Sequence, residues 1–250
     1  MQVFVINLAG AGDRLAYMRD QLGDGFERIE AVRGSAVPEH LAGNFRGTTP
    51  LLPEEIGCYA SHLVAAETIQ ARKLSCAVVL EDDVELADDF RAVVKEAVGQ
   101  LHGEWDILSL SGAKQHPHCR LSELAGGREL VRYLHFPKTT AAYAISPSGC
   151  RKLLVERVRS RPIDVDIRYG WEMGINGFGV FPPPARQTGR FASSIPKARQ
   201  QRFYWRADPF GYLMGRLDGV RRLGLANLVR AYLPKTRPMD PSSQGDAAGA

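Results

Sequence analysis

Three consecutive apolar residues of this chain run directly into three acids, in the stretch Ala77-Val78-Val79-Leu80-Glu81-Asp82-Asp83. The branched, unbroken apolar run predicts a short buried strand. The acids then lie at the carboxyl end of that strand, which is where α/β sheets bind ligands. Because neighbouring carboxylates repel one another, the cluster favours a bound cation, and oxygen ligands suit Mg²⁺ or Mn²⁺ held together with a diphosphate. The alternative is that these acids, with the further acids up to Asp89, stand at the start of a helix, where negative charge is favourable.

Composition indicates one sizeable domain, alone or with an appendage. The chain has 250 residues, of which 44% are hydrophobic and 24% charged, so its core does not need disulfides. Its 4 cysteines include no CxxC pair, which favours reduced thiols in a cytosolic protein over a disulfide framework or a zinc site. Met1–Asn7 has no basic region before its apolar run and predicts a first strand, not a signal peptide. No apolar run approaches the roughly 18 residues that span a bilayer.

Positive charge is concentrated towards the C-terminal end of the sequence. From Arg186 onward there are 12 lysines and arginines against 4 acids, and residues 1–185 carry a net charge of −4. We therefore divide the chain into a main domain (1–198), a basic amphipathic segment (199–233) and a disordered tail (234–250). Leucines and arginines at helical spacing within 212–237 predict a helix that either lies on an anionic membrane or packs on the domain. No nucleic-acid-binding motif accompanies the charge.

Hydrophobic patterning predicts alternating strands and helices, and hence an α/β fold. Strands are expected at 3–8, 26–32, 77–80, 105–110, 129–136, 139–146 and 178–181. Helices are expected from a cap at Asp13 to Leu22, and at 53–74, 90–101 and 147–161. Residues 35–53 and 111–128 are expected to form loops.

Two short motifs permit other chemistry. The turn Ala9-Gly10-Ala11-Gly12 supplies the first two glycines of a dinucleotide-binding fingerprint, but the third would fall at Leu15. His116-Pro117-His118-Cys119 contains metal-ligand residue types at a spacing too tight for a usual zinc site.

Two further acids stand in the segment Pro162-Ile163-Asp164-Val165-Asp166. Their alternation predicts an extended segment with both carboxylates on one side. Either acid would serve as the general base of a transfer reaction if it lies near the metal. The alternative is that both acids cap the following helix, and spacing alone does not separate the two interpretations.

Four blocks of the sequence occur in a characteristic order. They are Val5–Leu8 with Asp13-Arg14, the stretch Gly57-Cys58-Tyr59-Ala60-Ser61-His62, the stretch Val79–Asp83, and Thr140–Ser146 leading to Pro162-Ile163-Asp164. In this order they resemble glycosyltransferase family 25, the lipooligosaccharide β-galactosyltransferases and collagen galactosyltransferases. A weaker fifth block is Pro184–Gln187 with Ser194-Ile195. The blocks cover about residues 3–195, so the basic C-terminal segment lies outside the resemblance.

The resemblance implies a fold and an activity. The fold would be a GT-A-type, Rossmann-like α/β/α sandwich. The activity would be metal-dependent, inverting transfer of a sugar, galactose from UDP-galactose, to a saccharide of a lipid-linked glycan such as lipooligosaccharide or lipopolysaccharide. Such an enzyme would work in the cytoplasm or on the inner membrane. Two alternatives stay open: a nucleotide-dependent oxidoreductase using Gly10 and Gly12, and a non-catalytic glycan- or membrane-binding module.

The resemblance also implies roles for single residues. Asp83 would bind Mn²⁺ or Mg²⁺, and Glu81 the metal or the ribose. Asp164 would be the base or an acceptor ligand, with Asp166 as its substitute. The residues expected to contact the donor UDP-sugar are Asn7, Arg14, Ser61, His62, Glu81, Asp82 and Gln187.

Overall fold

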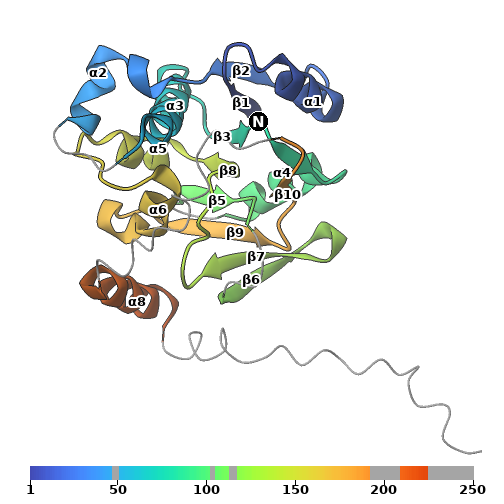
Figure 1. Cartoon of the computed structure of the whole chain (residues 1–250). Coiled ribbons are helices and arrows are strands. Elements are labelled where there is room, and N and C mark those ends of the chain that lie inside the picture. Colours follow the sequence, from blue (N-terminus) through green and yellow to red (C-terminus); the bar gives the residue numbers. More distant parts are fainter. Residues whose placement is uncertain (47–50, 102–104, 113–116, 192–208, 225–250) are drawn as a thin grey trace, which may run out of the picture.

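The computed structural model describes residues 1–46, 51–101, 105–112, 117–191 and 209–224 (Figure 1). The strands are β1 (Gln2–Asn7), β2 (Glu27–Glu30), β3 (Ala77–Glu81), β4 (Val84–Leu86), β5 (Ile107–Ser109), β6 (His118–Leu124), β7 (Arg128–Tyr133), β8 (Ala142–Ile145), β9 (Gly177–Phe181) and β10 (Ala185–Gln187). The α-helices are α1 (Gly12–Leu22), α2 (Glu39–Ala42), α3 (Pro53–Ala71), α4 (Phe90–Gln100), α5 (Pro147–Leu154), α6 (Ile163–Arg168) and α8 (Pro209–Leu223). Short 3₁₀ turns are η1 (Gly34–Ala36), η2 (Gly43–Phe45), η3 (Ala125–Gly127) and η4 (Gly170–Met173).

Eight of the strands form one mixed sheet in the order β2-β1-β3-β8-β5-β9-β7-β6. β1 pairs in parallel with both β2 and β3, and β8 runs antiparallel between β3 and β5. β9 is parallel to β5, and the antiparallel pair β6–β7 extends the sheet beyond β9. β4 and β10 form a separate antiparallel pair. The carboxyl ends of the parallel strands β1, β2 and β3 therefore meet at one edge of the sheet.

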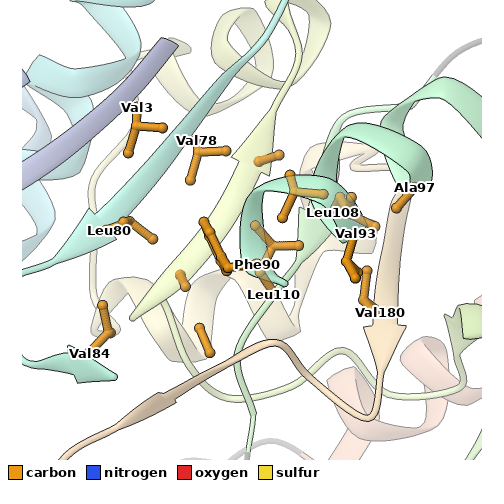
Figure 2. Packing of buried hydrophobic residues seen from close by; sticks show 14 of the residues in the cluster. Val3, Val78, Leu80, Val84, Phe90, Val93, Ala97, Leu108, Leu110 and Val180 are labelled. Carbon is orange, nitrogen blue, oxygen red and sulfur yellow. The ribbon is translucent and has the colours of Figure 1, made fainter. Parts of the chain in front are cut away.

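Alternation along the central strands divides the core into two layers, one on each face of the sheet. In β1, Val3 and Val5 join the cluster that contains α1 and α4, whereas Phe4 and Ile6 join the cluster that contains α3, α5 and α6. Figure 2 shows the first layer, in which Phe90 and Val93 of α4 pack towards side chains of the central strands. Helices cover both faces, so the prediction of an α/β/α sandwich is confirmed.

Several segments differ from the sequence-based prediction. Residues 35–53, expected to form a loop, contain the short helix α2 and parts of the turns η1 and η2. Residues 118–124, expected within a loop, form strand β6, and His116 of the His/Cys motif lies outside the described residues. β6 pairs only with β7 at the end of the sheet and buries little more than Cys119 and Leu124, so it has no clear apolar alternation. The helix expected at 147–161 ends at Leu154, and residues 155–161 form an irregular connection.

The segment expected to be extended at 162–166 is the start of helix α6. Neither acid caps this helix, because Pro162 occupies the N-cap position; Asp164 and Asp166 lie within its first turn. Asp13 likewise lies inside the first turn of α1, where Ala11 is the N-cap. In both helices the acids favour the positive end of the helix dipole without forming the predicted side-chain cap.

Helix α8 is the described part of the predicted amphipathic segment. Its Gly215 lies against Trp171 and its Gly219 against Leu134, so one side of the helix contacts the main domain (Figure 1). The block Ser194-Ile195, the basic and aromatic residues 199–206 and the predicted tail 234–250 lie outside the described residues. Across the described ranges, none of the helices combines the length and apolar character needed to cross a membrane.

Candidate active site

A pocket of about 840 Å³ lies at the carboxyl ends of β1, β2 and β3. The N-terminal half of α3, the residues preceding β8, the start of α6 and the end of β10 complete its wall. This volume is within the usual range for small-molecule sites. Its charged lining residues are Arg14, Arg33, Lys138, Glu54, Glu55, Glu81, Asp82, Asp83 and Asp164. The pocket thus has more carboxylates than cationic side chains, as expected for a site that holds a metal ion.

Asp82, the middle acid, is already neutralised by the protein. Its two oxygens accept hydrogen bonds from Arg14 and from the Asn7 side chain, each at 2.8 Å. Arg28 in turn donates to the Asn7 side-chain oxygen at 3.0 Å. Arg14 and Asp82 line the pocket, whereas Asn7 is buried and absent from its wall. Asn7, predicted to contact the donor, therefore reaches the pocket only through Asp82.

Asp83, the third acid, is the carboxylate with an unsatisfied atom. Its Oδ1 is buried and has no hydrogen-bond partner among the described residues. Burial raises the pKa of Asp83 to about 6, repulsion from Glu81 adds to the shift, and a hydrogen bond from Gln187 opposes it. The backbone N–H of Thr188 also donates to the Asp83 carbonyl at 2.9 Å, which ties β10 to the acidic turn. A carboxylate with one unsatisfied oxygen and a raised pKa, beside a second carboxylate, fits a divalent cation.

Glu81, the first acid, is held by two neighbours. Thr140 donates its hydroxyl to Glu81 Oε1 at 2.8 Å, and His62 Nε2 lies 3.6 Å from the same oxygen. Burial acts to raise the pKa of Glu81, but His62, Thr140 and Arg14 outweigh it, so the pKa lies below the ordinary value. Glu81 is therefore ionised at neutral pH.

The Gly57–His62 block positions α3 against the loop that follows β2. A Cβ atom on Gly57 would lie 2.6 Å from the Val32 carbonyl oxygen, so only glycine permits this approach. Ser61 accepts a hydrogen bond from the Val32 N–H at 2.8 Å and donates to the Gly57 carbonyl at 2.7 Å. Ser61 and His62 both line the pocket, although the Ser61 hydroxyl is already used in these contacts.

Asp164 lines the same pocket from the opposite element, α6. Its nearest cation is Lys138, at 4.0 Å. Burial raises the pKa of Asp164; Lys138 opposes this shift and Glu81 reinforces it. A carboxylate with a raised pKa is a stronger base, which is what proton abstraction from a hydroxyl requires.

Asp166 does not line the pocket; it is buried and lies among three arginines, of which Arg159 is buried and the other two are partly exposed. Arg157 donates to it at 2.8 Å and Arg161 at 2.9 Å, and the Tyr59 hydroxyl donates at 2.8 Å. Arg159 lies 3.9 Å away, its side chain fully buried. With all of these donors directed at it, Asp166 is suited to holding α6 on α3 rather than to taking a proton from a substrate.

Several pocket residues were not singled out as site residues from sequence. Lys138 and Thr140 precede strand β8, and Cys58 lies on α3 one turn before His62. The sequence signal for Thr140 was its place in the Thr140–Ser146 block. In the structure, strand β8 of that block pairs antiparallel with the acidic strand β3. Of the turn at 9–12, Ala11 is the residue that lines the pocket.

An α/β/α sandwich with an acidic pocket at its strand ends is the layout of a nucleotide- or sugar-binding α/β protein. The family model described as "Glycosyltransferase family 25 (LPS biosynthesis protein)" matches residues 1–168. The chain belongs to glycosyltransferase family 25, as the order of its sequence blocks predicts.

Similar proteins include both transferases and a protein named as inactive. The chain is 30% identical over 184 residues to mouse "Inactive glycosyltransferase 25 family member 3", which covers 66% of this chain and 30% of that protein. It is 28% identical over 174 residues to mouse "Procollagen galactosyltransferase 2", covering 61% of this chain and 27% of that protein. The aligned region thus spans less than a third of these relatives. A solved inositol-1-phosphate CTP transferase from T. maritima aligns over 75% of this chain and 70% of its own, with a TM-score of 0.37 and 9% identity.

Proposed function

We propose that this chain is an inverting, metal-dependent glycosyltransferase of the GT-A type. It would transfer galactose from UDP-galactose to a saccharide of a lipid-linked cell-surface glycan such as lipooligosaccharide or lipopolysaccharide. Family membership supports a sugar transfer reaction, and a nucleotide sugar is the donor that suits a metal-binding acidic turn. The cytoplasmic face of the inner membrane is the proposed place of action.

One observation carries this proposal. A single pocket brings together an unsatisfied carboxylate at the end of β3 and a second carboxylate, with a raised pKa, on α6. Asp83 is suited to a metal–diphosphate and Asp164 to proton abstraction. A pocket that only bound glycans would not need these two acids in destabilised states.

Asp83 and Glu81 would hold Mn²⁺ or Mg²⁺, whose charge would offset the negative charge on the leaving diphosphate. Asp164 accepts the proton of the acceptor hydroxyl as its oxygen attacks the anomeric carbon. Because one displacement replaces the diphosphate, the configuration of the sugar inverts. Lys138, 4.0 Å from Asp164, keeps a positive charge beside the base.

The alternative is a decayed, non-catalytic module, because several relatives of this chain are named inactive. We favour an active enzyme, because Glu81, Asp83 and Asp164 all line one pocket. Transfer of radiolabelled galactose to a lipooligosaccharide extract separates the two readings. Binding of the donor without turnover in that assay would support the module.

Mn²⁺ and UDP-galactose together are expected to raise the melting temperature of the wild-type protein by about 5–10 °C at a hundredfold excess over Kd. The Asp83→Ala variant is expected to lose the metal-dependent part of this shift. Because only the ionised carboxylate binds a cation, the shift in the wild type should grow as pH rises through about 6, the pKa of Asp83. Differential scanning fluorimetry measures both effects.

Asp88→Ala is the matched control, since Asp88 is an exposed acid of the same region that does not line the pocket. It should keep the full shift. An unchanged metal-dependent shift in Asp83→Ala, or retained galactose transfer by that variant, would rule out the assigned role of Asp83.

We further propose that α8, together with the rest of the segment 212–237, brings the enzyme to an anionic membrane. Residues 212–224 of that segment are described, and Phe210 precedes it on the same helix. Phe210, Leu213 and Leu217 form an apolar stripe and are 70%, 52% and 52% exposed. Arg221, on the next turn, is exposed as well. An apolar stripe next to basic residues is typical of helices that lie in a membrane interface.

Replacing Phe210, Leu213 and Leu217 together by Ser is expected to abolish flotation with vesicles that contain anionic lipid. The expected loss follows from removing the apolar area that enters the interface. Leu121→Ser is the control, because Leu121 is 50% exposed on β6, at the far end of the sheet. Flotation that persists undiminished in the triple variant would show that α8 is not the membrane contact.

A further inference from the structure

The pocket contains a second group of ligand-type side chains, different in chemistry from the acidic turn. Cys58 and His62 are one turn apart on α3, and Glu81 ends β3. One ligand atom from each of the three residues lies within 4.8 Å of the others. All three side chains line the pocket. Sulfur, imidazole nitrogen and one carboxylate oxygen form a softer donor set than oxygen ligands alone.

His62 supplies an independent observation that this group can bind a ligand. The residue is 1% exposed, and its Nε2 atom has no hydrogen-bond partner among the described residues. Its other ring nitrogen, Nδ1, lies 2.9 Å from the Tyr143 hydroxyl. In the metal-free protein Nε2 faces Glu81 Oε1 at 3.6 Å, and His62 lowers the pKa of that carboxyl. A metal would take the place of the Nε2 proton, and the neutral ring would then keep its proton on Nδ1 and donate it to Tyr143, as in metal-binding histidines whose other nitrogen is fixed by a neighbour.

The distances suit a tetrahedral ion. Ligand atoms around Zn²⁺ are separated by about 3.3–3.6 Å when the metal–ligand bonds have their usual lengths. The separation of His62 Nε2 and Glu81 Oε1 is 3.6 Å, and the Thr140 hydroxyl holds that carboxylate in place. The widest separation in the group, up to 4.8 Å, would need to close by about 1 Å, which a rotation of the Cys58 side chain can supply.

We propose that Cys58, His62 and Glu81 form a binding site for a Zn²⁺-class ion, with its fourth position open to the pocket. Three protein ligands and one open position are the arrangement of exchangeable or catalytic zinc sites. The site is distinct from the oxygen-only site proposed at Asp83, although both use Glu81, so a soft ion at Cys58 competes for a donor-site residue. This inference concerns binding of the metal alone and holds whether or not the chain transfers sugar.

Cobalt(II) is the probe, because a thiolate–cobalt bond gives a charge-transfer absorption in the near ultraviolet that oxygen and nitrogen ligands do not give. The full chain titrated with Co²⁺ in the absence of any nucleotide sugar is expected to show this band at one equivalent. Cys58→Ser should remove the band, His62→Gln should weaken Co²⁺ binding by 10-fold or more, and Zn²⁺ should displace the cobalt. Cys76→Ser is the control, since Cys76 is half-buried like Cys58 but does not line the pocket.

A second measurement keeps the test independent of how the variants fold. In the wild-type protein, Zn²⁺ is expected to slow alkylation of Cys58 by a maleimide at least 10-fold while leaving Cys76 unaffected, as read by peptide mass spectrometry. Absence of the cobalt band in the wild type, its loss in Cys76→Ser, or equal alkylation of Cys58 with and without Zn²⁺ would each overturn the proposal. Asp83→Ala should keep the cobalt band, so failure of the transferase proposal and failure of this one are distinguishable.

Discussion

Asp164→Asn is expected to slow galactose transfer by about 10²- to 10⁴-fold, the usual cost of removing a general base. The amide has the size of the carboxylate but takes no proton from the acceptor. Asp164 lines the pocket across from the acidic turn, so its loss leaves the metal- and donor-binding residues in place. The shift in melting temperature caused by Mn²⁺ and UDP-galactose should therefore be unchanged. Steady-state kinetics should show the loss in kcat rather than in the donor KM.

The pH profile gives an independent measurement of the same role. Because the base acts only when ionised, the rate of transfer should rise as pH rises through the pKa of Asp164, which burial places above the ordinary aspartate value. Glu54→Gln is the control, since Glu54 is an exposed carboxylate of the same pocket wall. Full activity in Asp164→Asn, or an equal loss in Glu54→Gln, would contradict the assignment.

Asp166→Asn is expected to destabilise the protein by about 3–5 kcal/mol, although it lies only two residues from the proposed base. Removing one partner of a buried charge cluster leaves the remaining charges uncompensated. Here Arg159 is fully buried, and Arg157 and Arg161 both donate to the same carboxylate. A loss of this size is a large part of the total stability of a single domain. Urea denaturation monitored by circular dichroism gives the difference.

Asp164→Asn serves as the matched control for this stability effect. It makes the same chemical change in the first turn of the same helix, but among the described residues Asp164 pairs with one cation, Lys138, at 4.0 Å. The two variants should therefore behave differently. Asp164→Asn should lose activity and keep its stability, whereas Asp166→Asn should lose stability. Equal stability of Asp166→Asn and the wild type would show that the arginine cluster does not depend on this charge.

Local pattern was enough to predict the central part of the fold. The apolar run before Glu81 formed the buried strand β3, and its acids lie at the pocket because parallel strands end at the same edge. The edge strand β6 was missed because an edge strand buries few side chains and loses its alternation. Helix α6 was missed because six residues after a proline are too few for a helical period to appear.

The separate environments of Asp164 and Asp166 could not be predicted, because both occupy similar positions in one short segment. The two acids differ in their tertiary contacts. The connection after α5 brings Arg157, Arg159 and Arg161 to Asp166 and not to Asp164. The sequence shows these arginines at alternate positions but not which carboxylate they meet. The sequence likewise does not show that the Asn7 side chain donates to Asp82.

The pairing of β4 with β10 determines where this protein can be shortened. The family match ends at residue 168, yet strand β9 at 177–181 lies between β5 and β7 inside the large sheet. Beyond it, Gln187 pairs with Val84, and the Thr188 N–H donates to the carbonyl of Asp83. A fragment that ends at residue 168 would lose strand β9 from the sheet. It would also lose the pairing of β10 with β4 and the hydrogen bond from Thr188 to Asp83. The smallest autonomous unit for expression must therefore extend past Thr188.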